Sequence, residues 1–254
     1  MTNKEVFVEK PLPGLSRFKP HRINFYSIIF IRSGKGNHFI DFKTYDYEKG
    51  TIFFIASEQV HSFEWNDQRD ARFLTFTEDF FQKSRLGSTL IQRTGLFNYQ
   101  MNEPKVQLNE EQFERFDRLV TLIEKEYSQM DEFVSEEIIL SSLRIFLCFA
   151  ERISREQQKD LPISKYDEEF VHFQKLLKAH LFESRMVQFY AEKLNYSTKK
   201  LNRMSRDVVQ RSAKDYINDL LIMEIKRFLM NTTCLLYTSP SPRDRTRSRM
   251  PSSA

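Results

Sequence analysis

The hydrophobic pattern divides the chain into a β-rich first third and a helical remainder. Between residues 24 and 77, short runs rich in Ile, Phe, Tyr and Thr alternate with turn signals such as Ser33-Gly-Lys-Gly36. Runs of this kind are typical of strands in an antiparallel barrel or sandwich. The predicted strands cover residues 24–32, 37–43, 51–56, 60–65 and 72–77. Residues 1–22, which contain three prolines, are predicted to form an extended arm.

From residue 78 onward, the apolar residues recur with helical spacing. A short helix is expected at residues 78–85, followed by an irregular stretch over residues 86–104. Two longer amphipathic helices are expected at residues 109–127 and 135–153, and each carries one apolar stripe. These two helices either cover the barrel or form a contact between subunits.

Residues 155–166 are polar, contain Pro162, and are predicted to link two domains. After an amphipathic helix at residues 168–181, two apolar stripes of helical spacing follow: Val187, Ala191 and Leu194, then Leu201, Met204 and Val208. Between the stripes, Asn195 suits the left-handed conformation that ends a helix. Ser197 suits an N-cap. Helix–turn–helix DNA-binding units are built in this way.

The second of these helices has a basic face opposite its apolar stripe: Lys199, Lys200, Asn202, Arg203 and Arg206. Residues 184–214 hold eight Lys or Arg and two Asp or Glu, a net charge of +6 over 31 residues. Any solvated helix carries some charge, but a local excess of this size is typical of a phosphate-binding surface. We therefore predict that this unit binds DNA.

Residues 191–229 resemble the first half of an AraC/XylS-type DNA-binding domain, in which one long helix joins two helix–turn–helix units. The matching positions are Ala191, Leu194, Ser197, Leu201, Arg203, Ser212, Tyr216, Ile217, Lys226, Arg227 and Leu229. The sequence departs from the family at Gln210, where Gly is usual, and at Ser205, where Phe is frequent. Ser205 is expected to loosen the core beneath the helix. More weakly, the N-terminal half resembles the cupin-like barrel of such regulators.

The resemblance implies how the second helix contacts DNA in the major groove. Base contacts are expected from Lys199, Asn202 and Arg203, because Arg suits guanine and Asn suits adenine. Phosphate contacts are expected from the remaining basic side chains: Lys200, Arg206, Arg211 and Lys214. The partners implied are promoter DNA, a small-molecule effector, a second copy of the chain and RNA polymerase. In this family the helices after the barrel often form the dimer contact.

The barrel raises two alternative functions, a ligand-binding module without DNA binding and a cupin enzyme. Cupin metals need several His and a carboxylate, commonly including an H-x-H pair. His38 is followed by Phe39 and Ile40, so this pair is missing, and His61 and Glu58 alone do not make a metal site. We predict no metal, no cofactor and no enzymatic activity. His38 and His61 remain the candidate residues for an effector pocket.

The last 21 residues, 234–254, are rich in Ser, Pro and Arg and have no periodicity. They are either an ordinary disordered basic tail or a sequence that does not belong to the protein and arises from a sequencing artefact. Residues 234–244 back-translate, with permitted codons, to DNA resembling a transposase-type sequencing adapter. Residues 248–254 back-translate to DNA resembling the flow-cell end of the same adapter. We interpret the tail as adapter read-through, so the second helix–turn–helix of the parent protein is expected to be missing.

Removing the tail changes the net charge and the number of cysteines. The tail carries four Arg and one Asp, so +3 of the formal +4 belongs to it. Cys148 is then the single remaining cysteine; it is expected to be a buried small hydrophobe, and no disulfide is possible. No apolar run approaches the roughly 20 residues of a membrane span. The first ten residues contain no apolar segment typical of a signal peptide, so a cytoplasmic location is expected.

Together these patterns predict an α+β protein with an antiparallel cupin-like barrel followed by an incomplete helix–turn–helix domain. The expected divisions are the arm (1–22), the barrel (23–85), a helical dimerisation or cover segment (86–154), the linker (155–166), a partial DNA-binding domain (167–233) and the tail (234–254).

Overall fold

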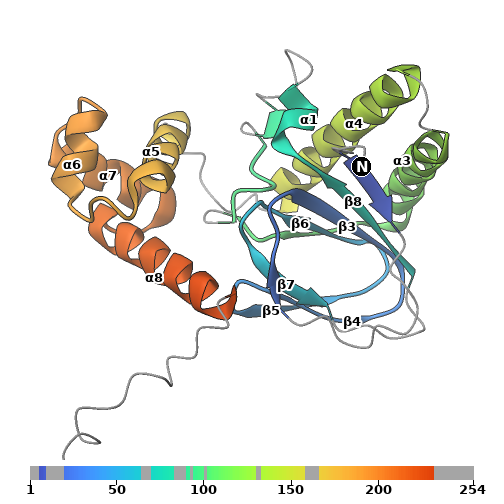
Figure 1. The fold of residues 1–254 in the computed structure, drawn as a ribbon, viewed down its shortest axis with the longest axis horizontal. Helices are drawn as coiled ribbons and strands as arrows, with labels where there is room; N and C mark the ends of the chain where they lie inside the picture. Colours follow the sequence, from blue (N-terminus) through green and yellow to red (C-terminus); the bar gives the residue numbers. More distant parts are fainter. Residues whose placement is uncertain are drawn as a thin grey trace, which may run out of the picture.

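The computed structural model describes residues 6–9, 20–63, 70–82, 90–91, 94–99, 102–129, 133–157 and 166–231. These residues form two lobes, seen at the right and the left of Figure 1. The barrel lobe comprises the described residues up to 157, and the helical lobe comprises residues 166–231. An antiparallel cupin-like barrel is followed by helices, so the α+β prediction is confirmed.

Two antiparallel sheets make the barrel. The five-stranded sheet has the order β1 (Val6–Glu9), β8 (Asp70–Phe76), β3 (Tyr26–Ser33), β6 (Thr51–Ile55) and β9 (Lys105–Gln107). The four-stranded sheet has the order β2 (His21–Arg22), β7 (Val60–Phe63), β4 (Gly36–Ile40) and β5 (Lys43–Tyr47).

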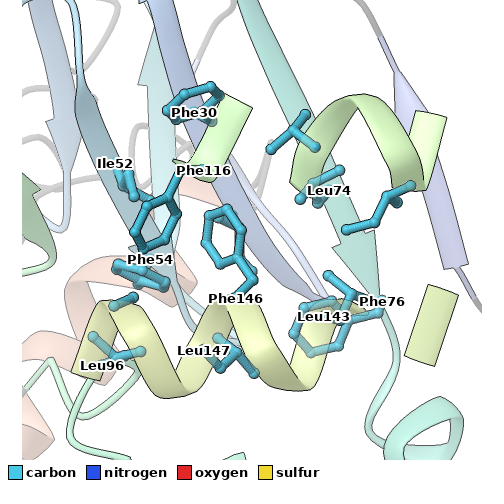
Figure 2. Close-up of a cluster of buried hydrophobic side chains, with 14 of the residues drawn as sticks. Phe30, Ile52, Phe54, Leu74, Phe76, Leu96, Phe116, Leu143, Phe146 and Leu147 are labelled. Atoms are coloured by element: carbon cyan, nitrogen blue, oxygen red, sulfur yellow. The ribbon is translucent and has the colours of Figure 1, made fainter. Parts of the chain in front are cut away.

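The central strands are apolar at nearly every position because both of their faces are buried. In β3, Ile28 and Phe30 belong to the core shared with the helices, whereas Ile29 and Ile31 belong to the core inside the barrel. The outer core is closed by α3 (Glu110–Ser128) and α4 (Phe133–Gln157). Figure 2 shows Phe116 and Phe146 lying against these strands. The two helices therefore cover the barrel; a dimer contact by them remains a prediction.

The prediction of one strand over residues 37–43 is wrong. Asp41 and Phe42 have positive φ angles, 45° and 70°, and they reverse the chain between β4 and β5. A two-residue hairpin turn needs such angles and usually recruits Asn-Gly or Asp-Gly, a signal that this sequence lacks. Hydrogen bonds hold the turn instead: the Asp41 carboxylate accepts from the backbone N–H of Val60 (3.1 Å) and from the Gln59 side chain (2.5 Å).

The structure adds to or corrects three further expectations. The described part of the arm is extended, as expected, and it joins the barrel, since its β1 pairs with β8 and its β2 pairs with β7. Residues 105–107, which follow the stretch expected to be irregular and for which no element was predicted, form β9 and pair with β6. Cys148 is exposed, because it lies on the side of α4 opposite the buried stripe of Leu143, Phe146 and Ala150. The short helix α1 is described over Glu78–Gln82.

The helical lobe has a hydrophobic core of its own. Its elements are α5 (Asp167–His180), α6 (Val187–Lys193), α7 (Thr198–Val209) and α8 (Ala213–Asn231). The core is built around Phe170, Phe173, Tyr190, Leu201 and Ile217. In Figure 1, α8 runs from this lobe to the barrel, which it meets near β5.

Part of the predicted linker, residues 158–165, and the whole tail lie outside the described residues. Of the helices in the described part of the chain, none is long and apolar enough to cross a membrane.

Candidate nucleic-acid interface

The turn between α6 and α7 is built from local hydrogen bonds. The backbone N–H of Asn195 donates to Glu192 O (3.0 Å) and that of Tyr196 donates to Ala191 O (2.8 Å). This is the Schellman arrangement, and it requires the left-handed backbone that Asn195 adopts, with φ 55°. Ser197 then caps α7, because its hydroxyl accepts the backbone N–H of Lys200 at 3.1 Å. Both conformations agree with the prediction.

The turn between α7 and α8 uses a less favourable residue. Gln210 is left-handed, with φ 56°, at the position where glycine is usual in the family that the sequence resembles. A residue with a Cβ costs about 1–2 kcal/mol in this conformation. The backbone N–H of Gln210 donates to Arg206 O at 3.1 Å and closes α7 despite that cost.

Asn202 joins α7 to α8. Its side-chain oxygen accepts the backbone N–H of Ala213 (3.1 Å), the first residue of α8, and its side-chain nitrogen donates to Thr198 O (3.0 Å). Both ends of this amide are therefore bound to backbone within the lobe. One lone pair of the oxygen and one N–H of the nitrogen remain for the role predicted for Asn202, contact with a base.

The other side chains predicted to contact bases remain open to solvent. Lys199 and Arg203 are exposed, one turn apart on α7, and Arg206 continues the same face. Together with Asn202 and Asp207 they line a shallow groove along the helix. Within the described part of the chain, Lys199, Arg203 and Arg206 have no ion-pair partner. This face of α7 therefore presents three cations available to an anionic ligand.

The residues predicted to contact phosphates fall into two groups. Lys200 donates to Glu169 of α5 (3.2 Å) and lies 3.5 Å from the centre of the Tyr196 ring. Desolvation lowers its pKa, but Glu169 outweighs this, and the pKa is raised overall. Arg211 pairs with Asp219 at 2.6 Å. Lys200 and Arg211 thus share their charge with carboxylates, whereas Arg206 and Lys214 are exposed.

Ser205 lies in the core beneath α7. Its side chain is fully buried, and its hydroxyl has no hydrogen-bond partner among the described residues. A buried unsatisfied hydroxyl is destabilising. This agrees with the expectation that Ser205 weakens the core at this position.

The two candidate effector residues of the barrel touch each other. His38 Nε2 and His61 Nδ1 are 3.1 Å apart and both side chains are buried. The ring of His21 lies 4.7 Å from that of His61. Burial, helped by the nearby His21, lowers the pKa of His61 to about 3, so this ring is neutral at pH 7. No group of three or more potential ligands suited to a metal occurs among the described residues.

A cavity of about 480 Å³ lies elsewhere, between the two lobes. Its barrel side includes Arg22, Tyr26 and Phe97, and its helical side includes Lys175 and Leu181. The sequence analysis missed this site. No sequence signal points to it, since its lining residues are spread from 22 to 224 and only the packing of α5 and α8 against the barrel assembles them.

Comparisons with known proteins agree with this architecture. Residues 11–143 match the family model of the AraC-like ligand binding domain. No curated protein sequence matches the chain.

Solved structures resemble the chain more loosely. Apo ToxT from Vibrio cholerae is 13% identical and aligns over 86% of this chain and 80% of its own, with a TM-score of 0.43. The AraC-like transcriptional activator CuxR is 11% identical over 87% of this chain and 73% of its own, with a TM-score of 0.34. Oxalate decarboxylase from Bacillus subtilis is 15% identical over only 24% of this chain and 18% of its own, with a TM-score of 0.21.

These structural likenesses are too low to carry the assignment, which rests on the domain match. That match covers more than half of the chain and includes the barrel strands β2–β9 and α3. The chain therefore belongs to the family of regulators that carry the AraC-like ligand-binding domain.

Proposed function

We propose that this chain is a sequence-specific DNA-binding transcriptional regulator of AraC type, responsive to an effector through its barrel lobe. The observation that carries the proposal is the face of α7 with Lys199, Arg203 and Arg206 exposed and not engaged in ion pairs within the described residues. Cations on the exposed face of the second helix of such a unit are placed for the major groove. The chain is then cytoplasmic and not an enzyme.

The parent protein is proposed to continue into a second helix–turn–helix unit. Support comes from the second half of α8, which exposes Ile222, Ile225, Phe228, Leu229 and Met230. Exposed apolar clusters of this kind mark contact sites. Resequencing the gene beyond codon 233 tests this, and a native gene that encodes residues 234–254 would contradict it.

The DNA proposal is tested by fluorescence anisotropy with promoter fragments, using the resequenced parent and the 254-residue chain. The parent is expected to bind, and its log K should fall with log salt by about 0.9 per neutralised phosphate. The 254-residue chain should bind weakly or not at all. Full-affinity, site-specific binding by residues 1–233 alone would contradict the need for a second unit.

Single substitutions in the parent separate the two classes of contact. Arg203→Ala should cost about 1–3 kcal/mol and relax preference at one base pair. Arg206→Ala should weaken all sequences alike, as should Lys200→Ala, although less because Glu169 already shares the charge of Lys200. Arg155→Ala, on the exposed side of α4, is the matched control. A loss for Arg203→Ala that is uniform over all sequences would contradict its assignment to a base.

A second candidate function is a small-molecule-binding module without competent DNA binding. The cavity between the lobes favours it, since apolar walls with a few polar groups are typical of ligand sites. Ligand-induced protection of this cavity in hydrogen exchange, with no DNA retained by the parent at low salt, would favour the module over the regulator.

A further inference from the structure

The most deeply buried charge of the helical lobe lies where α8 meets the barrel. Arg227 is fully buried, yet its partner is 186 residues away in the sequence. Its Nε donates to Asp41 Oδ1 at 2.8 Å and its Nη2 donates to Asp41 Oδ2, which makes the pair bidentate. Asp41 is the first residue of the β4–β5 turn.

The rest of the guanidinium is also engaged. Its Nη1 donates to Glu224, one turn earlier on α8, and to the Tyr99 hydroxyl at 3.1 Å. The guanidinium carbon lies 4.6 Å from the centre of the Tyr99 ring. These four residues, Arg227, Asp41, Glu224 and Tyr99, are called the latch below.

A second arginine joins the latch to the edge of the barrel. Arg22 of β2 pairs with Glu58 (2.5 Å) and with Glu224 (3.2 Å). Next to Arg227, Lys226 lies 5.6 Å from the ring centre of Phe42, the other residue of the β4–β5 turn. Consecutive residues of α8 therefore contact both residues of one hairpin turn.

The geometry of the latch differs from that of an apolar contact. Apolar surfaces tolerate sliding, whereas a planar guanidinium bound at two oxygens fixes distance and angle together. Asp41 cannot swing to follow a moving partner, because Val60 N–H and Gln59 already hold its carboxylate. The Asp41 carboxylate is therefore held in place on the barrel, and it binds Arg227 in one orientation of α8.

The latch also borders the cavity between the lobes. Tyr99 and Glu224 belong to both, and Arg22 and Glu58 line the same cavity. A ligand bound there would contact members of the latch directly. The latch thus joins the border of the cavity to α8, and α8 packs against α7 in the core of the helical lobe.

We propose that the Arg227–Asp41 pair is a conformational latch that fixes the orientation of the helical lobe, and hence of α7, relative to the barrel lobe. Its regulatory meaning rests on the proposed DNA-binding function of α7. The latch itself is a property of the two lobes and can be measured without DNA.

The test is a distance measurement between spin labels in the full 254-residue chain in frozen solution. Cys148→Ser and Cys234→Ser remove the native thiols, and Asp46→Cys on β5 and Lys193→Cys on α6 carry the labels. Arg227→Met, Asp41→Asn and the double variant are compared with the labelled 254-residue chain that carries neither substitution. The matched control is Arg155→Met, which removes an exposed ion pair from α4.

The labelled chain without latch substitutions and the Arg155→Met control should each give one narrow distribution of distances. Each single variant should broaden the distribution at least twofold, and the double variant should be no broader than either single one, because one interaction is removed in all three. A narrow distribution in both Arg227→Met and Asp41→Asn would overturn the proposal. So would additive broadening in the double variant.

Two precautions keep the outcome clear. Far-UV circular dichroism establishes that each variant is folded, and if Arg227→Met is not, Asp41→Asn carries the test without altering α8. Anisotropy with promoter DNA is run on the resequenced parent protein as a separate measurement. Absence of DNA binding there would overturn the proposed function and leave the latch standing, whereas unchanged distances would overturn the latch alone.

Discussion

The barrel interior and the contact between the lobes bury polar groups in opposite ways. Inside the barrel, His38 and His61 contact each other, and burial keeps His61 neutral. Between the lobes, desolvation lowers the pKa of Arg227, but the hydrogen bond to Asp41 and the electrostatic interactions with Tyr99, Asp41 and Glu224 outweigh it, so the pKa is raised and Arg227 stays charged. His61 can become hydrated only if the barrel unfolds, whereas Arg227 can become hydrated if the two lobes move apart. Changes at His61 should therefore alter the stability of the barrel lobe, and changes at Arg227 should alter the orientation of the two lobes.

The largest expected effect is a loss of packing inside the barrel. Phe53 is fully buried and lies 4.6 Å, ring to ring, from His38. Phe53→Ala should lower the free energy of unfolding of the barrel lobe by about 3–5 kcal/mol. Hydrogen exchange in increasing urea, followed separately for peptides of the two lobes, measures this. Equal loss in α5–α8 would show that the lobes do not unfold independently.

The next effect is a dependence on pH. The pKa of His61 is about 3 in the folded state, against 6.5 for an unperturbed histidine, so between these values the unfolded chain binds more protons. The contribution of His61 to the unfolding free energy is therefore fully present above pH 6.5. It falls as the pH drops, and about 2 kcal/mol is lost at pH 5. Urea midpoints of the barrel lobe at pH 7 and pH 5 measure it. In His61→Gln the difference should shrink, and an unchanged difference would assign it to other groups.

A smaller effect is expected at the contact between the lobes. Removing one partner of an ion pair inside a core costs about 3–5 kcal/mol. Arg227→Met should lower the unfolding free energy of either lobe by no more than about 1 kcal/mol, since separation of the lobes rehydrates Asp41. The same exchange experiment reports it. A loss of several kcal/mol within the barrel lobe would mean that the two buried sites are of one kind.

The smallest effect concerns the core of the helical lobe. Ser205→Ala removes a buried hydroxyl without a partner among the described residues and should stabilise this lobe by up to about 1 kcal/mol. Ser197→Ala is the contrasting variant, because it removes the N-cap of α7 and should cost about 1 kcal/mol. Thermal unfolding of the full chain, followed in helices α6–α8, measures both changes in stability. Destabilisation by Ser205→Ala would show that its hydroxyl has a favourable role.

What could be predicted from sequence follows the range of the interactions. The caps at Asn195 and Ser197 depend on bonds to residues no more than five positions away, and the sequence predicts them. The Asp41 turn depends on Gln59 and Val60, and the sequence analysis missed it. For Arg227, the family pattern predicts its position on the helix but does not predict its partner Asp41, which is 186 residues away in the barrel.

The same rule holds for the candidate site. Periodicity placed Lys199, Arg203 and Arg206 together on one face of α7, where the structure has them exposed. It could not separate Lys200 from them, since the carboxylate that shares its charge comes from α5. Local charge counts therefore overstate the number of cations that remain available.

The amide of Asn202 has a consequence for discrimination between DNA sequences. An adenine that paired with this amide would use the second lone pair of the oxygen that accepts the Ala213 N–H and the second N–H of the nitrogen that donates to Thr198 O. The two existing bonds fix the plane of the amide, whereas no hydrogen bond within the described residues fixes the guanidinium of Arg203. A wrong base should therefore be tolerated less opposite Asn202, whose amide cannot turn without breaking a bond to the start of α8 or to Thr198, than opposite Arg203.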